Sequence, residues 1–217
     1  MIGDPGAASR YFQSRFGHAP QRTGVWRVVC EYLQAFIPSE GSVLDLGAGY
    51  CSFINHVEAA DKHALDIFRE FTQFAHPDVQ THVGSCHDLS VFPPHYFDAV
   101  FASNLLEHLT HEAVADTLSE VRRVLKPSGR FILVQPNFRY CYREYFDDYT
   151  HLQVFTHVAL ADLLASNGFG IERVEPRFLP LSFKSRLPKW PWIVRLYLRS
   201  PIRPFAKQML VVGRAMV

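Results

Sequence analysis

Short apolar runs alternate with amphipathic stretches along most of the chain. Seven of these runs predict strands, at residues 42–47, 63–68, 80–84, 97–103, 130–136, 170–176 and 208–216. Apolar residues at helical spacing predict helices at residues 53–60, 111–125 and 157–169. Buried strands joined by helices favour a mainly parallel sheet covered on both faces, with its ligand site beyond the carboxyl ends of the strands.

Local signals mark the ends of two of these helices. The sequence "KPSG", residues 126–129, combines a basic residue, a proline and a glycine, and it predicts a chain break before Arg130. Thr156 stands where it would cap the helix at 157–169, and Gly168 stands near that helix's end. Both helices should therefore stop short of the strands that follow them.

Composition places the chain among globular α/β proteins. It has 217 residues, of which 48% are hydrophobic and 20% charged, so we expect one sizeable core. The sequence has no apolar run long enough for a membrane span, and its start lacks the apolar core of a signal peptide, which together predict a cytoplasmic location. Four cysteines without a C-x-x-C pair predict reduced thiols, not a zinc site or disulfides.

The stretch "SVLDLGAGYCSF", residues 42–53, predicts a cofactor loop between a strand and a helix. Gly47 and Gly49 allow a tight turn and a close approach of a ligand to the backbone. The dinucleotide fingerprint would need glycine or alanine at Ser52, and the Asp45 carboxylate would repel a pyrophosphate. An acidic loop instead suits S-adenosylmethionine, which carries a sulfonium and an ammonium group and no phosphate.

Five motifs in order resemble those of class I S-adenosylmethionine-dependent methyltransferases: "VLDLGAG", "ALDIF", "GSCHDL", "FDAVFASNLLEHL" and "RVLKPSGRFILVQPN". The resemblance covers roughly residues 40–175. It implies an α/β fold with a Rossmann-like, doubly wound, seven-stranded, mainly parallel sheet whose last strand is antiparallel. One departure is Cys51, which stands in place of the third glycine of the usual loop, and we expect cofactor binding to survive it.

The same resemblance implies a set of cofactor-binding residues. The methionine end would be held by Asp45 and the backbone at Gly47 and Gly49, and the ribose hydroxyls by Asp66. The adenine would meet Asp88 and the backbone amide of Leu89. The remaining cofactor-binding candidates are Arg22, for the methionine carboxylate, Ile67 and Asn104.

Catalytic candidates come from the segment after the strand at 130–136 and from the "LLEHL" motif. An acceptor hydroxyl needs a base, and imidazole titrates near working pH, so His151 is the first candidate and His108 the second. A structural role for each histidine remains an alternative. Asp147 and Asp148 lack an assembled set of partner ligands, so we predict no metal site.

The last 42 residues differ in charge from the rest of the chain, and the sequence predicts three segments. Residues 1–40 predict a helical lid with Trp26, Val29, Leu33 and Phe36 on its apolar face, residues 41–175 the cofactor-binding core, and residues 176–217 a basic insertion and final strand. Residues 176–217 carry nine basic residues and no acidic one, although the whole chain has a net charge of only +1. The insertion holds tryptophans beside cations, with an amphipathic helix expected from about Trp192 to Arg199, which is typical of interfacial helices.

These features together predict a methyltransferase that acts on a hydroxyl of a sugar or another small molecule. The basic insertion resembles those of methyltransferases associated with cell-surface glycan assembly, which implies an anionic or lipid-linked acceptor and transient contact with the inner membrane surface through residues 184–207. No nucleic-acid motif accompanies the charge, so we expect no nucleic-acid partner. Three alternatives stay open: an NAD-dependent sugar-modifying enzyme, a non-catalytic S-adenosylmethionine-binding regulator, and, for the insertion, a solvated flap. The oligomeric state is also open.

Overall fold

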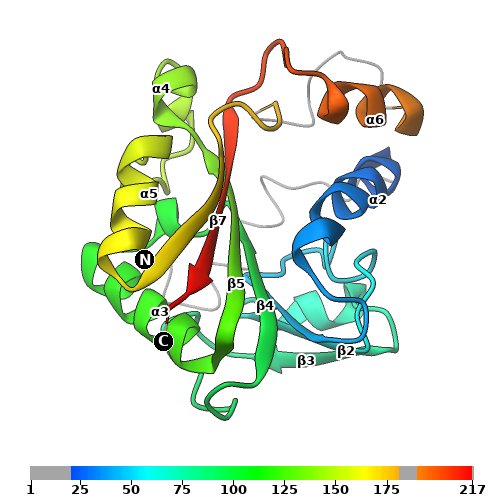
Figure 1. Cartoon of the computed structure of the whole chain (residues 1–217), viewed down its shortest axis with the longest axis vertical. Coiled ribbons are helices and arrows are strands. Elements are labelled where there is room, and N and C mark those ends of the chain that lie inside the picture. Colours follow the sequence, from blue (N-terminus) through cyan, green and yellow to red (C-terminus); the bar gives the residue numbers. More distant parts are fainter. Residues whose placement is uncertain (1–20, 181–189, 217) are drawn as a thin grey trace.

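The protein is built on one seven-stranded sheet. The computed structural model describes residues 21–180 and 190–216, and the strands run in the order β3-β2-β1-β4-β5-β7-β6 (Figure 1). Strands β1 to β5 are parallel, whereas β7 is antiparallel to both of its neighbours, β5 and β6. The strands are β1 (Ser42–Leu46), β2 (Asp61–Asp66), β3 (Val79–Val83), β4 (Phe97–Ser103), β5 (Leu125–Pro136), β6 (Phe169–Glu175) and β7 (Gln208–Ala215).

Each of the seven predicted strands is present, and the expected Rossmann-like fold is confirmed. The clearest case is β4, which has the predicted bounds, and β1 is buried at every position. Apolar side chains on both faces of a central parallel strand are covered by helices, which explains why these runs are continuously apolar instead of alternating.

Helices form a layer on each face of the sheet. Helices α2 (Gln21–Leu33) and α6 (Pro191–Arg199) pack together over one face, and α3 (His111–Val124) and α5 (His157–Ser166) cover the other (Figure 1). Each layer closes a separate cluster of buried apolar side chains against the strands. The other helical segments are short: α4 (Phe138–Cys141), η1 (Gln34–Phe36), η2 (Arg69–Phe74), η3 (Leu106–His108) and η4 (Tyr145–Asp147).

Two local predictions were wrong. Residues 49–56 form turns instead of the start of a helix, although Phe53, Ile54 and Val57 are buried as their helical spacing suggested. The segment keeps two helix-like hydrogen bonds, from Asn55 to Cys51 and from Val57 to Phe53, each of 3.1 Å. The helical spacing of Phe53, Ile54 and Val57 in the sequence reflects their burial in the core and not a regular helix.

The "KPSG" sequence is also not a break before a strand. Strand β5 begins at Leu125, and the four residues form a bulge inside it, where the pairing with β4 shifts register. Ser128 takes a left-handed φ of 66°, and a Cβ at Gly129 would lie 2.9 Å from the carbonyl oxygen of Lys126. The turn chemistry was therefore recognised correctly, but a β-bulge uses the same residue types.

The basic insertion connects β6 to β7, as predicted, and contains α6. This helix covers the expected residues, with one proline added at its start. The capping predictions for α5 were correct: Thr156 Oγ1 accepts a hydrogen bond from the amide of Ala159, and Gly168 has a φ of 84°. Among the described residues, no helix is long and apolar enough to cross a membrane.

Candidate functional site

A glycine turn leads out of β1 at the carboxyl edge of the sheet. Gly47, Gly49 and Cys51 all have left-handed φ angles, of 75°, 52° and 53°. The amides of Gly47 and Ala48 donate to the carbonyl of Leu65, at 2.8 and 3.2 Å, which ties the turn to the end of β2. Cys51 keeps the conformation that a third glycine would supply, and its side chain is buried in the α2-side core.

Asp66 holds this turn from the neighbouring strand. It ends β2, and its carboxylate accepts hydrogen bonds from the amides of Gly49 and Phe68, each at 2.8 Å, and from that of Ile67. Burial raises the pKa of Asp66, while these three amides oppose the shift. The carboxylate is therefore fixed in place beside the turn, and its contact with the ribose stays a prediction.

Asp45 adds a second buried carboxylate to the same turn. It lies in β1 with 3% of its surface exposed, and the amide of Ile54 donates to it. Burial, with a contribution from the negative charge of Asp66, raises the pKa of Asp45 to about 8. A cation bound here would favour the charged form of both carboxylates, since an opposite charge favours ionisation.

The two residues predicted to contact the adenine, Asp88 and Leu89, lie after β3 and already have hydrogen-bond partners within the protein. The Asp88 carboxylate is exposed and accepts from Ser90, and the amide of Leu89 donates to Glu120 Oε2 at 2.8 Å. Sequence reasoning passed over Ser85 and Cys86, which follow Gly84, whose amide donates to the Asp66 carbonyl at 3.0 Å. Their position directly after β3 could have indicated them.

Asn104 occupies the turn after β4. Its φ is 50°, its amide donates to Val134, and its side-chain oxygen accepts from Gln208 Nε2 at 2.7 Å. Asn104 therefore joins β4 to β5 and β7 at the carboxyl edge. The remaining cofactor candidate, Arg22, lies in the first turn of α2, and its side chain is outside the described part of the structure.

The structure brings the two catalytic candidates together. His108, at the end of η3, and His151, in the loop before α5, have ring centroids 4.9 Å apart. The amides of Leu152 and Gln153 both donate to the carbonyl of Glu107, at 2.8 and 3.2 Å, and so hold the two loops side by side. Residues more than 40 positions apart in the sequence thus share one site.

Sequence reasoning missed Glu107, which lies beside His108 and His151. Its side chain is 1% exposed, and apart from its own backbone amide neither carboxylate oxygen has a hydrogen-bond donor among the described residues. Burial, together with the negative charge of Asp148, raises the pKa of Glu107 to about 8. One ligand-type atom from each of Glu107, His108 and His151 lies within 4.8 Å of the other two. The only signal in the sequence was an acid within the apolar "LLEHL".

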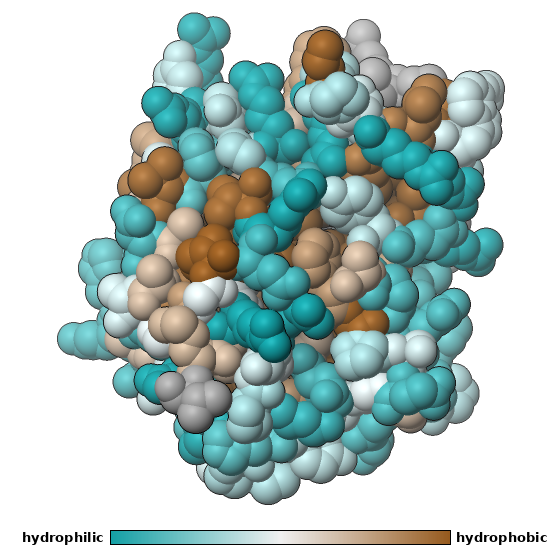
Figure 2. All heavy atoms as spheres, in the orientation of Figure 1, coloured by the Kyte–Doolittle hydropathy of each residue, from teal (hydrophilic) through white to brown (hydrophobic). Residues whose placement is uncertain are grey.

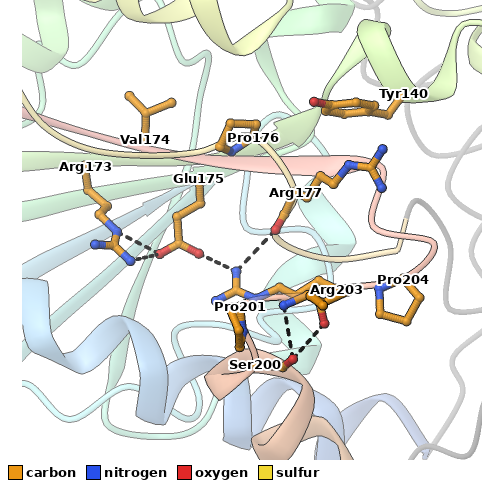
Figure 3. Close-up of a pocket in the computed structure, with 11 residues that line it drawn as sticks. Tyr140, Arg173, Val174, Glu175, Pro176, Arg177, Ser200, Pro201, Arg203 and Pro204 are labelled. Atoms are coloured by element: carbon orange, nitrogen blue, oxygen red, sulfur yellow. Dashed lines mark hydrogen bonds and ion pairs between the residues drawn. The ribbon is translucent and has the colours of Figure 1, made fainter.

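A cavity of about 530 Å³ opens where β6 ends and the insertion begins. Figure 3 shows Glu175 between Arg173 and Arg203, and it shows Arg177 reaching toward Tyr140. The guanidinium of Arg177 lies 4.2 Å from the centre of that ring. Burial raises the pKa of Glu175, but bonds from Tyr32 and the two arginines outweigh it and hold the pKa below its usual range.

The insertion exposes apolar side chains, and several of its basic side chains form ion pairs with glutamates. Arg195, Arg203 and Lys207 form ion pairs with Glu31, Glu175 and Glu144, all from outside the insertion. Lys184, Arg186 and Lys189 lie outside the described residues. Apolar side chains are nevertheless exposed at the upper right, where α6 lies (Figures 1 and 2); on and beside this helix they are Trp190, Trp192, Leu196, Ile202 and Phe205.

Comparison with known proteins agrees with the site at the glycine turn. Residues 44–133 match the family described as "Methyltransferase domain". A 44-residue segment is 48% identical to the ubiquinone/menaquinone biosynthesis C-methyltransferase of Paraburkholderia phytofirmans, and it covers 20% of this chain and 17% of that relative. The match therefore spans about a sixth of the relative's length.

Solved structures share the fold over nearly the whole chain. A possible histamine N-methyltransferase of Thermotoga maritima superposes with a TM-score of 0.67 at 16% identity, covering 96% of this chain and 94% of that one. The 1,6-didemethyltoxoflavin-N1-methyltransferase of Burkholderia thailandensis, solved with S-adenosylhomocysteine, gives 0.64 at 18% identity, with 98% and 86% covered. An S-adenosylmethionine-dependent methyltransferase of Archaeoglobus fulgidus gives 0.65 at 20% identity, with 87% and 94% covered.

The domain match begins in β1, the strand that precedes the acidic glycine turn, and includes that turn. Over residues 44–133 the chain is similar to methyltransferase domains, and its fold is that of solved S-adenosylmethionine-dependent methyltransferases.

Proposed function

We propose that the protein transfers the methyl group of S-adenosylmethionine to a hydroxyl of a small-molecule acceptor, with a sugar as the first candidate. The observation that carries this proposal is the pair of His108 and His151 beside buried Glu107, at the same sheet edge as the acidic glycine turn. A hydroxyl acceptor needs help in losing its proton, and imidazoles are suited to this.

The cofactor half of the site would act by position and charge. Methyl transfer from a sulfonium is an in-line displacement, so the rate depends on holding the methyl carbon against the acceptor oxygen. The turn at Gly47 and Gly49 would accept the methionine end, and the carboxylates of Asp45 and Asp66 would favour the cationic cofactor. Asp66, already oriented by three amides, would direct its remaining lone pairs to the ribose hydroxyls.

The acceptor half would place a ring nitrogen at the hydroxyl. His151 Nδ1 lies 2.6 Å from the carbonyl of Tyr145, and because a carbonyl only accepts, Nδ1 carries the hydrogen and Nε2 has the lone pair. Nε2 would take the hydroxyl proton as the oxygen attacks the methyl carbon. His108 lies beside it as the second candidate.

An anionic acceptor is supported by the arginine-lined cavity. It contains three arginines and one glutamate, and Arg177 is stacked on Tyr140 without an ion pair in the described part of the chain. A guanidinium on an aromatic ring presents its donors to phosphate or carboxylate groups. Exposed Trp190, Trp192 and Leu196 on the insertion favour a lipid-linked acceptor and transient contact with a membrane surface.

Removing the Asp66 carboxylate should weaken cofactor binding. Asp66→Ala should cost about 2–3 kcal/mol of binding free energy for S-adenosylmethionine, because the lost contacts are hydrogen bonds to a charged group. Calorimetric titration measures this. Asp116→Ala, which removes an exposed aspartate on α3, is the matched control and should bind normally. Equal affinity in the two variants would refute the ribose assignment.

The raised pKa of Asp45 predicts that cofactor binding depends on pH. At pH 6 to 7 Asp45 is mostly protonated, since its pKa is about 8, and a bound cation would lower that pKa and release the proton. Affinity for S-adenosylmethionine should therefore rise up to about tenfold from pH 6 to 7, below the titration of the cofactor's own amino group. Asp45→Asn should flatten this slope; a wild-type affinity that does not change with pH would contradict the assignment.

His151→Ala tests the acceptor half. Turnover should fall by about 10²-fold or more while the affinity for S-adenosylmethionine is unchanged, which is the usual scale for loss of a proton-transfer group. Methylation of a panel of sugars and other hydroxyl compounds, followed with labelled cofactor, provides the measurement. The control is His111→Ala, an exposed histidine at the start of α3. Near-normal turnover in His151→Ala would exclude a catalytic role for this residue.

Membrane contact can be tested by co-sedimentation with liposomes. Binding should appear with anionic vesicles at low salt and weaken as salt rises, because the expected attraction is partly electrostatic. Trp190→Ser combined with Trp192→Ser should reduce it, since both side chains are exposed. If the wild-type protein stays in the supernatant with anionic vesicles at low salt, the insertion is a solvated flap.

A further inference from the structure

We propose that Glu107, His108 and His151 form a binding site for one divalent first-row transition-metal ion. The inference rests on the proposed function for the place of the acceptor, and it adds a second route for the same proton: with the ion bound, His151 Nε2 is a ligand and the hydroxyl proton leaves to water. The ion would hold the acceptor's hydroxyl at an open coordination position.

Both imidazoles are held by a hydrogen bond at Nδ1. His151 Nδ1 donates to the carbonyl of Tyr145, at 2.6 Å. His108 Nδ1 lies 3.0 Å from Thr150 Oγ1, and because that hydroxyl donates to Asp148 at 2.6 Å, it accepts from the ring. Both rings therefore carry their hydrogen on Nδ1 and their lone pair on Nε2. Metal-binding histidines typically have their second nitrogen fixed in this way, by a carbonyl or a carboxylate chain.

Glu107 lacks a side-chain partner in the described part of the chain. It is 1% exposed, and apart from its own backbone amide neither carboxylate oxygen has a hydrogen-bond donor among residues 21–180 and 190–216. A buried carboxylate without partners costs several kcal/mol if charged, so such groups are normally paired or bound to metals. Its oxygen lies in the same cluster as the ring nitrogens, within 4.8 Å of them. The missing partner of Glu107 is thus expected at the point where the three side chains converge.

The distances suit a shared ion after a small adjustment. Bonds from zinc to nitrogen or oxygen are about 2.0–2.2 Å, so two ligands of one tetrahedral ion lie roughly 3.4 Å apart. The cluster would therefore contract by on the order of 1 Å through side-chain rotation. Backbone bonds from Leu152 and Gln153 to the Glu107 carbonyl already hold the two loops in register.

The donor set indicates the class of ion. Two imidazoles and one carboxylate suit zinc, iron, cobalt or nickel, whereas magnesium and calcium prefer an all-oxygen set. Three protein ligands also leave at least one position open, as in catalytic metal sites. Asp147 and Asp148, the acids that sequence reasoning considered, are not in this cluster; Asp148 instead orients His108 through Thr150.

A bound ion would explain how the acceptor hydroxyl loses its proton. A hydroxyl bound to it has a lowered pKa and loses its proton to water. The resulting oxygen attacks the methyl carbon, the new carbon–oxygen bond forms, and the electrons of the broken carbon–sulfur bond remain on sulfur. The products are the methylated acceptor and S-adenosylhomocysteine, with no oxidant or reductant involved.

Titration of the untagged full chain with Co²⁺ tests the site, with visible absorption reporting the coordination geometry. About one ion should bind per chain, and Zn²⁺ should displace it while Mg²⁺ at the same concentration should not. Glu107→Gln, His108→Ala and His151→Ala should each lower the affinity by at least about 10-fold, the smallest loss expected even for a residue that only supports a ligand. The matched controls Glu112→Gln and His111→Ala, both exposed on α3, should bind Co²⁺ as the wild type does.

The outcome does not depend on knowing the acceptor. Absence of saturable Co²⁺ binding in the wild type, or binding that survives in all three ligand variants, overturns the proposal. Circular dichroism of each variant separates ligand loss from unfolding, and Glu107→Gln keeps the shape of the side chain. Titration of the same samples with S-adenosylmethionine tests the proposed function separately, because the cofactor residues are not metal ligands.

Discussion

The carboxylate of Asp66 is the fixed point around which the cofactor half of the protein is arranged. It ends β2, yet two of its three amide donors belong to the turn that follows β2 and the third, Gly49, to the turn that follows β1. The carbonyl of the same residue accepts from Gly84 after β3. One residue thus contacts three strand ends, and the Gly49 amide that reaches it belongs to a turn with left-handed angles at Gly47, Gly49 and Cys51.

Burial gives this arrangement its selectivity for charge. Two carboxylates, Asp45 and Asp66, lie beside one short turn with little solvent around them, and the pKa of each is raised. Keeping both ionised without a partner is costly, because burial penalises the charged form and each charge opposes the other. A ligand with a sulfonium and an ammonium group removes that penalty, whereas a pyrophosphate would add to it. The glycines allow a ligand to approach the backbone closely, and the two carboxylates favour a cationic ligand over an anionic one.

The sequence predicted the sheet and the presence of the glycine turn well because both depend on local patterns. Buried strands appear as apolar runs, and the turn appears as glycines directly after one of them. The failures occurred where one local pattern has two structural outcomes. Residues 53–57 bury the side chains of a helix without forming one, and "KPSG" is a bulge inside β5 instead of a break before it. Asp88 matches a family motif and its carboxylate is exposed, so its contact with the adenine stays a prediction.

The acceptor half could not have been derived in the same way, because it depends on contacts between distant segments. His108 and His151 were recognised one at a time from their residue type, but their proximity depends on two amides that bond to the Glu107 carbonyl, and no local pattern encodes that contact. Glu107 itself looks, in sequence, like one polar position in a helical turn. Only its burial with no donor other than its own backbone amide in the described structure makes it unusual. Stability alone would favour an apolar residue there, since an unpartnered buried acid contributes nothing to the core. The acid is therefore best explained by what binds to it, and the chemistry of the acceptor side starts from that residue.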